Sequence, residues 1–418
     1  MAATIEDGRP DFRQFVRPHD MVVWGQGCGE PRTLTAALMA QRRDIGPFKV
    51  FTGLCYSETP DPQFTDMVEF LSYHGGGSNR RLGEKLDILP CHYFQLPSVL
   101  RTRCDVLLLQ LSPADDAGYH SLGLSHDYVV PLIDSARIVI AEVNDQVPWI
   151  AGERTISAAD IDVLVRSSRP PIEIPSRASD AVDRAIAARA AGLIEDGATL
   201  QIGIGALPAA ILGALSRHRR LGVHSGSLFD PVVDLLQSGA IDNSSKGLDD
   251  GVTVAGTLLG TRKLFAFADR NRRLQMRSAT YTHDGEVLGR LNKFVAINAA
   301  IEVDLTGQVN AELADGRYLG AVGGAVDFVR GAQRSRGGLA ITALRSRAGN
   351  KAKIVAQLSG PVSTSRADTG IVVSEHGVAD LRGQPLKERI KRMIAIAHPD
   401  DRDALARHQA RSSISAIS

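Results

Sequence analysis

The sequence has little of several features that mark specialised classes of protein. Only 4 of its 418 residues are cysteine, namely Cys28, Cys55, Cys91 and Cys104. They form no Cys-x-x-Cys pair, and no histidine lies at zinc-finger spacing from them. A disulfide scaffold and a structural zinc site are therefore excluded, and we expect no metal and no permanently bound cofactor.

Net charge and long apolar runs are also missing. Lys and Arg total 48 and Asp and Glu 47, a formal charge of +1, which is too small to attract nucleic acid or an anionic membrane. No apolar stretch approaches the roughly 20 residues of a membrane-spanning helix. The first residues, MAATIEDGRPDF, contain acids and no apolar core, unlike a secretory signal. We expect a soluble cytoplasmic protein with no membrane or nucleic-acid partner.

Aromatic residues are scarce, at 5%, whereas glycine is abundant, with 40 residues. This composition favours an α/β protein with many tight turns over an aromatic-rich binding module. Apolar strands such as 106–109, 138–140 and 371–373 alternate with amphipathic helical segments such as 181–193. The pattern predicts two mostly parallel sheets covered by helices.

A strand, a glycine turn and a helix occur twice in this order. Met21–Trp24 leads into GQGCGEP, and Thr199–Ile202 leads into GIGALP, where Pro208 suits a first helical turn. Such a turn points backbone N–H groups at a ligand and can hold a phosphate or an oxyanion, although a tight turn without a ligand remains the alternative. Neither copy is a complete G-x-G-x-x-G, so we do not expect a nicotinamide site.

An apolar strand followed by D-x-x-G also recurs, at 105–118 and at 294–307, where the strand is expected over 294–303. Two matches in the same order indicate a duplicated α/β unit. The polar, proline-bearing stretch 166–180 has no helical or strand period and is the expected linker. We therefore predict two domains, residues 1–180 and residues 181–418.

Several long segments resemble the acetyl-CoA hydrolase/transferase family, of the 4-hydroxybutyrate CoA-transferase type. They are IGIGALPAAIL at 202–212, INAAIEVDLTGQVNAE at 297–312, GAVGGAVDFVRGA at 320–332 and SEHGVADLRG at 374–383, with LSPADDAGYHSLG at 111–123 and IAEVN at 140–144. The resemblance implies two tandem open α/β domains of the CoA-transferase fold with the active site between them. It also implies an acyl-CoA substrate, with coenzyme A present only as part of it, and a small carboxylic acid as a second substrate. Enzymes of this kind commonly form homodimers, which we expect here.

In this family a glutamate carboxylate attacks the acyl-CoA and carries CoA to a second acid as a glutamyl thioester. The glutamate lies in a segment of the form G-[IV]-H-[ST]-E-M, which matches residues 222–227 here, GVHSGS. The glutamate position is Gly226, and no acid occurs between Gly222 and Phe229. Neighbouring residues also depart from the family pattern, as does Ala325, where glutamine is common. The resemblance therefore implies that the standard mechanism cannot operate from this position.

The segments that the resemblance assigns to CoA are less altered. We expect acyl-CoA to bind at eight residues, with backbone N–H groups of the turn at 203–207 facing the thioester oxygen. These residues are Gly203, Ile204, Gly205, Ala206, Leu207, Ile301, Gly323 and Gly324.

Other residues were weighed as replacements for the glutamate. His224 could activate water, or be the histidine that the family motif already contains. Ser225 matches an ordinary Ser/Thr position and faces away from His224 on a strand. Asp230 could orient a base or bind substrate, or it could simply begin the helix 232–236. Glu375 could supply a carboxylate or belong to a structural network with Arg382.

Cys28 could be a nucleophile in the first glycine turn or a small buried residue. Three functions remain open. The first is hydrolysis by water, of a thioester or of a C–C bond in a β-keto acyl-CoA. The second is CoA transfer by a non-standard route, and the third is acyl-CoA binding without catalysis. The sequence leaves the acyl group undetermined.

Overall fold

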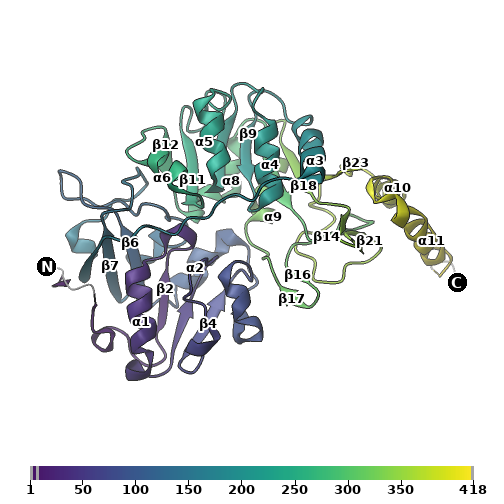
Figure 1. Ribbon diagram of the computed structural model, residues 1–418. Coiled ribbons are helices and arrows are strands. Elements are labelled where there is room, and N and C mark those ends of the chain that lie inside the picture. Colours follow the sequence, from purple (N-terminus) through teal and green to yellow (C-terminus); the bar gives the residue numbers. More distant parts are fainter. Residues whose placement is uncertain (1–2, 6–8, 416–418) are drawn as a thin grey trace. The chain divides into compact units, whose positions relative to one another are not determined.

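The computed structural model describes residues 3–5 and 9–415 (Figure 1). The chain forms two compact units, each assembled from separate stretches of sequence. Unit 1 comprises the chain up to residue 175 with 223–233 and 251–284, and unit 2 comprises 176–222, 234–250 and the chain from 285 onwards. The first change of unit, after Pro175, lies inside the expected linker. The division into domains 1–180 and 181–418 stays a prediction.

Unit 1 contains a sheet in which every neighbouring pair of strands is parallel. Its strand order is β1-β8-β7-β6-β2-β3-β4-β5. The strands are β1 (Ala3–Ile5), β8 (Val163–Ser167), β7 (Ile138–Asn144), β6 (Val106–Leu111), β2 (Met21–Trp24), β3 (Phe48–Phe51), β4 (Val68–Ser72) and β5 (Leu86–Ile88). The chain crosses from β2 towards β3 on one side and from β6 towards β7 on the other, so β2 and β6 flank the switch point at which α/β sheets bind ligands.

Helix α1 (Arg32–Ile45) packs on this sheet, and helix α2 (Leu96–Arg101) precedes β6 (Figure 1). Leu34 and Leu38 of α1 are fully buried in one core with Val22 and Trp24 of β2. These residues follow the spacing of one helix face and the continuous apolar run of a buried parallel strand. The predicted strand, turn and helix at the start of the chain are confirmed.

No side chain caps α1 from its own N-cap residue, Pro31. The fully buried Glu142 on β7 takes this place, since its Oε2 accepts from the backbone N of Thr33 at 2.9 Å and of Leu34 at 3.3 Å. Its Oε1 accepts from the hydroxyls of Thr33 and Ser167, each at 2.7 Å. A carboxylate at a helix N-terminus satisfies free N–H groups and favours the helix dipole.

Unit 1 also holds three further parallel strands with short helices. They are β10 (Gly222–Leu228), β11 (Thr253–Leu258) and β12 (Leu274–Met276), followed by α5 (Asp230–Gln237), α6 (Arg262–Ala268) and α7 (Ala279–Thr282) respectively. Only the first turn of α5 belongs to this unit. The strands pair in register, with His224 opposite Val254 and Ser225 opposite Ala255.

Unit 2 contains a second parallel arrangement, in which β13 (Phe294–Ala299) lies between β9 (Thr199–Ile202) and β18 (Leu339–Ala343). Strand β22 (Ile371–Ser374) continues it in parallel and β23 (Gly377–Asp380) closes it antiparallel. Its helices are α3 (Ala181–Ala191), α4 (Ala206–Ala214), α8 (Gly285–Arg290), α9 (Ala325–Arg334), α10 (Leu386–Ile396) and α11 (Pro399–Ser415). The α/β class and the two mostly parallel sheets are confirmed.

The expected single strand 294–303 is wrong, because the chain breaks after β13 and resumes as β14 (Glu302–Asp304). At the break the backbone N of Ile301 donates to the carbonyl of Asn310 at 3.0 Å. Strand β14 thereby enters a separate small sheet with β15 (Val309–Asn310) and β21 (Ile354–Val355). Two hairpins lie nearby in the sequence, β16 (Leu313–Ala314) with β17 (Arg317–Tyr318) and β19 (Arg347–Ala348) with β20 (Lys351–Ala352).

Across the described part of the chain, no helix combines the length and the apolar character that crossing a membrane would require. The cytoplasmic location stays a prediction.

The capping role of Glu142 predicts a clear loss of stability in Glu142→Gln. The amide would turn one acceptor into a donor and leave buried N–H groups unsatisfied, which costs about 2–3 kcal/mol. Urea unfolding followed by tryptophan fluorescence reports on unit 1, because both tryptophans, Trp24 and Trp149, lie there. Glu69→Gln, at an exposed position of β4, is the control and should change the free energy of unfolding little. Equal stability of the two variants would contradict the capping role.

Candidate functional site

Two of the expected CoA-binding residues and the candidate carboxylate Glu375 follow strands at one edge of the unit 2 sheet. Gly203 directly follows β9, Ile301 comes shortly after β13, and Glu375 directly follows β22. The carboxyl ends of parallel strands share one edge, which is where α/β proteins bind ligands. The CoA contacts expected of these segments stay a prediction.

The glycine turn after β9 leads into α4 as expected. Gly205 is the N-cap of α4 and has a φ of 127°, a conformation that side chains rarely adopt. Ile204 is 39% exposed, whereas Leu207 is buried. The first N–H groups of a helix have no acceptor within it, so the turn from Ile204 to Leu207 presents donors at this edge. Gly203 does not, because its N–H donates to the carbonyl of Ile297 at 2.8 Å.

The second glycine pair occupies an equivalent place before α9. Gly323 has a φ of 55°, and Gly324 is the N-cap of α9 without a side-chain hydrogen bond. Ala325 is the first residue of that helix. The pair therefore forms a tight backbone turn at a helix N-terminus, as the first glycine turn does.

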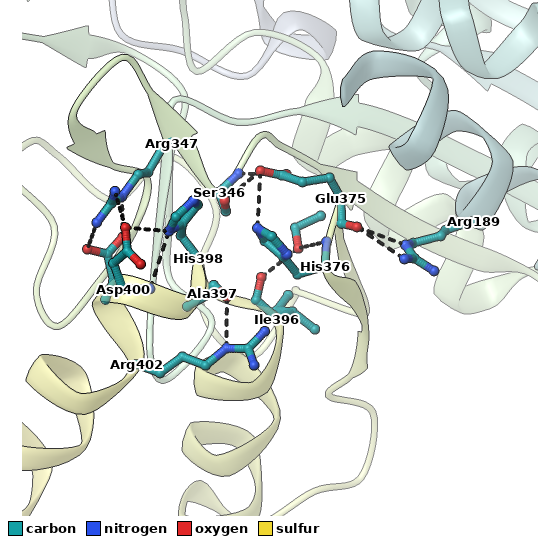
Figure 2. A network of polar contacts seen from close by, with 12 residues as sticks. Arg189, Ser346, Arg347, Glu375, His376, Ile396, Ala397, His398, Asp400 and Arg402 are labelled. Carbon is teal, nitrogen blue, oxygen red and sulfur yellow. Dashed lines mark hydrogen bonds and ion pairs between the residues drawn. The ribbon is translucent and has the colours of Figure 1, made fainter. Parts of the chain in front are cut away.

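Glu375 is held by the protein itself (Figure 2). One carboxylate oxygen accepts from the backbone N of Ser346 at 2.9 Å, and the other accepts from the Ser346 hydroxyl at 2.5 Å. His376 lies 3.6 Å from the same carboxylate. Burial opposes ionisation, but the hydrogen bonds from Ser346 and the charge of His376 outweigh it and lower the pKa of Glu375 below 4.5.

The surroundings of Glu375 tie β22 to the junction of α10 and α11. Figure 2 shows the T-shaped pair His376 and His398, whose ring centroids are 5.3 Å apart, and Arg347 bound to Asp400. The network does not include Arg382, which forms an ion pair with Asp380 at 2.7 Å. The expected partnership of Glu375 with Arg382 is therefore wrong. Asp380 is the last residue of β23 and lies close to Arg382 in the sequence, so Arg382 reaches it more readily than it reaches Glu375.

In unit 1, His224, Ser225 and Gly226 lie on β10. Adjacent strand residues face opposite sides, so His224 and position 226 share one face and Ser225 has the other. His224 is fully buried, with Nε2 3.2 Å from the carbonyl of Thr282 and its ring 5.8 Å from that of Tyr281. A carbonyl only accepts, so Nε2 carries the proton and Nδ1 is the basic atom of the ring. Ser225 is also fully buried.

Asp230 has a structural position at the start of α5. Its carboxylate accepts from the backbone N of Thr261 at 3.0 Å and from the Thr261 hydroxyl at 2.9 Å. Thr261 in turn caps α6 by accepting from the N of Lys263. Asp230 thus connects the beginnings of two helices, in agreement with the expectation that it begins a helix.

Cys28 is a buried residue in the turn after β2. Its side chain has no exposed surface, and its sulfur lies 3.8 Å from the carbonyl of Gly260. Burial raises the pKa of the thiol to about 12. A thiol that stays protonated is a poor nucleophile, so the structural alternative for Cys28 is supported.

The sequence analysis missed a buried carboxylate in the same unit, Asp127. It accepts hydrogen bonds from five groups and is 1% exposed. The donors are the hydroxyls of Ser125 and Thr257, the Tyr93 hydroxyl at 3.1 Å, Gln26 Nε2 at 2.6 Å and the Tyr128 backbone N at 2.6 Å. Burial raises the pKa of Asp127 despite these donors. The only sequence signal was that these polar residues follow apolar strands or adjoin a glycine turn.

Among the residues that the structure describes, no group of three or more His, Cys, Asp or Glu side chains is arranged to hold a metal ion.

Family models match most of the chain. Residues 11–174 match the acetyl-CoA hydrolase/transferase N-terminal domain, and residues 260–409 match the corresponding C-terminal domain. The 4-hydroxybutyrate coenzyme A transferase of Clostridium kluyveri is 37% identical over 407 residues, covering 93% of this chain and 94% of that protein. The acetyl-CoA hydrolase of Kluyveromyces lactis is 29% identical, covering 60% of this chain and 49% of that protein.

Among solved structures, RipA from Yersinia pestis superposes with a TM-score of 0.93 at 30% identity. The match covers 98% of this chain and 98% of RipA. The similarity therefore extends over the fold of the whole chain and not over one segment alone.

The lowered pKa of Glu375 predicts a pH-dependent contribution to stability. A carboxylate with a depressed pKa stabilises the folded state above its ordinary pKa of about 4.5 and loses this effect as pH falls through the lower folded value. Glu375→Gln should therefore be less stable than the natural protein at pH 7, with the difference shrinking towards pH 3. Urea unfolding by circular dichroism checks this, with Glu84→Gln at an exposed position as the control. A difference independent of pH would contradict it.

Proposed function

The chain belongs to the acetyl-CoA hydrolase/transferase family, and we propose that it hydrolyses an acyl-CoA with water in place of the glutamate nucleophile. The family membership makes it an enzyme of the acyl-CoA hydrolase or CoA-transferase kind. The proposal rests on one observation. Position 226 is glycine, and each other carboxylate considered for its role is occupied by hydrogen bonds of the protein itself.

Three carboxylates were compared for this role. Asp230 is bound by both donors of Thr261, and Glu375 by both donors of Ser346. Asp127 is bound by five donors and has 1% of its surface exposed. A carboxylate must give up such bonds before it attacks a thioester, and the exchange is unfavourable in a buried place. A water molecule has no such cost.

His224 is the group best suited to activate that water. It lies on the same face of β10 as position 226, where removal of a carboxylate leaves room, and its Nδ1 can take a proton. Water then adds to the thioester carbonyl, the C–S bond breaks, and the proton passes to the leaving CoA thiolate. The products are a carboxylic acid and free CoA. For a β-keto acyl-CoA the same attack at the keto carbon would break a C–C bond instead.

We also propose a role for the turn from Ile204 to Leu207, as the family resemblance implies. Its backbone N–H groups would stabilise the negative oxygen that forms when water adds to the carbonyl. We extend the same proposal to acyl-CoA contacts at Ile301, Gly323 and Gly324. Coenzyme A enters as part of the substrate, and no resident cofactor is needed. A homodimer remains our expectation for the assembly.

CoA transfer by a non-standard route is the second candidate. It is favoured by the similarity to the Clostridium kluyveri protein, whose name describes a transferase. Its difficulty is the missing nucleophile, since a carboxylic acid would have to attack the acyl-CoA directly. Binding of acyl-CoA without catalysis is the third candidate.

The first experiment incubates the purified protein with a panel of acyl-CoAs, with and without acetate. Free thiol is measured by a colour reagent and acyl-CoA species by mass spectrometry. The hydrolytic proposal predicts free CoA without acetate, at a rate that acetate does not raise. Acetyl-CoA formed only in the presence of acetate would establish transfer instead.

Two variants make the test specific to position 226. Gly226 does not have a left-handed φ, so a side chain there requires no unusual backbone. Gly226→Glu should gain acetate-dependent exchange, whereas Gly226→Gln, of equal size but without a carboxylate, should not. Exchange by the glutamate variant together with complete inactivity of the natural protein on every acyl-CoA tested would contradict the hydrolytic proposal and favour binding.

A further inference from the structure

Arg277 in unit 1 forms no ion pair with a carboxylate in the part of the chain that the structure describes. It directly follows β12, and its backbone N donates to the carbonyl of Ala255 at 2.8 Å. Its guanidinium donates from Nη2 to Gln275 Oε1 and lies 5.4 Å from the ring centroid of Tyr281. Its Nε is buried without a hydrogen-bond partner, and within residues 3–5 and 9–415 no carboxylate pairs with it.

Such an arrangement is costly unless something else completes it. A buried donor on a charged group that makes no hydrogen bond is unfavourable, because it has lost its contact with water without gaining a partner. Native proteins leave few buried polar groups without a partner, and the exceptions commonly mark ligand sites. The ring of Tyr281 offers the cation only a weak attraction compared with an anion. An anionic ligand would satisfy both the charge and the free donor.

A second unsatisfied group lies close by. His126 is fully buried, and neither of its ring nitrogens has a hydrogen-bond partner among the residues described. Burial, together with the charge of Arg277, lowers the pKa of His126 to about 3. The imidazole is therefore neutral and offers one donor and one acceptor. It adds hydrogen-bonding capacity beside Arg277 without adding charge.

His126 reaches this place because Gly152 has no side chain. A Cβ built on Gly152 would lie 2.2 Å from His126 Nε2, far inside van der Waals contact. Gly152 itself pairs with Met276, the residue before Arg277, in an isolated β-bridge. The backbone N of His126 donates to the carbonyl of Gly256 at 2.9 Å. The backbone of His126 is thus held at β11, and Arg277 directly follows β12.

This place adjoins position 226. A Cβ built on Gly256 would lie 3.0 Å from the carbonyl oxygen of Gly226 and 3.5 Å from that of Arg277. The ring centroid of His224, on the same face of β10, lies 5.8 Å from that of Tyr281. The guanidinium of Arg277 lies over the same Tyr281 ring. The unpaired cation is therefore a near neighbour of the strand on which the proposed hydrolysis takes place.

Asp127 does not serve as the counter-ion. Its Cβ lies 3.4 Å from the same built Cβ on Gly256, so it is also nearby, but all five groups bound to its carboxylate are neutral donors. The positive charge of Arg277 is left for the substrate.

We propose that Arg277 binds an ionised carboxylate on the acyl group, so that the substrate is the CoA thioester of a dicarboxylic acid. This rests on the proposed function only in placing the reacting carbonyl beside β10. A planar guanidinium with unused N–H donors matches a carboxylate. A phosphate of CoA has compatible chemistry, but the pantetheine chain separates the phosphates from the thioester. An acyl chain of a few carbons spans the shorter distance.

The test compares succinyl-CoA with butyryl-CoA, which have four-carbon acyl groups and differ in the terminal carboxylate. The natural protein should prefer succinyl-CoA. Arg277→Gln should lower kcat/KM for succinyl-CoA about 30–100-fold and change that for butyryl-CoA less than about 3-fold. Arg277→Lys should fall between, because it keeps the charge and loses the planar donors. Arg273→Gln, at an exposed position before β12, removes the same charge and should leave both values unchanged.

A binding measurement separates this inference from the hydrolytic proposal. Calorimetry with non-hydrolysable thioether analogues of succinyl-CoA and butyryl-CoA reports selectivity even if no turnover occurs. Loss of the preference for the succinyl analogue in Arg277→Gln supports the inference. An equal loss for both analogues and for free CoA would assign Arg277 to a phosphate and overturn it. A loss confined to free succinate would assign Arg277 to a separate acid, and would overturn it as well, as would no loss for any ligand.

Discussion

The carboxylate of Asp127 joins elements of unit 1 that are far apart in the sequence. Gln26, from the turn after β2, donates to it, and so does Thr257 on β11. Gln26 is itself oriented by the Tyr73 hydroxyl and the backbone N of Leu54, which both donate to its Oε1. A buried ion requires such complete hydrogen bonding. The network thereby fixes the end of β11 next to the switch point of the N-terminal sheet.

The position of β11 determines the surroundings of the adjacent strands β10 and β12. Gly256 on β11 allows the carbonyl of Gly226 to approach closely, because a Cβ at position 256 would lie 3.0 Å from that oxygen. The neighbourhood then holds Gly226, which has no side chain, and Arg277, which forms no ion pair with a carboxylate of the described chain. A fixed positive charge that forms no ion pair favours an anionic substrate.

Much of the fold followed from the sequence, because its signals are local. Continuous apolar runs predicted the buried parallel strands, and the glycine turns predicted the starts of α1 and α4. The strand expected over 294–303 was wrong because residues 299–301 at the break are themselves apolar, so the sequence shows no interruption where the hydrogen bond between Ile301 and Asn310 redirects the chain. The Glu375 network was missed for a similar reason, since Ser346 lies far from it in the sequence. The inference about Arg277 and His126 rests on side-chain nitrogens that have no hydrogen-bond partner among the described residues. A sequence pattern does not reveal such an absence.

The central claim is that water attacks the substrate directly. A single turnover in ¹⁸O-labelled water, with enzyme in excess over its acyl-CoA, tests this by mass spectrometry of product and protein. Direct attack predicts one ¹⁸O atom in the released acid, no label in the protein, and no CoA bound covalently to it. Label in a protein carboxylate, or a CoA adduct on any side chain, would show that a protein carboxylate still carries the reaction.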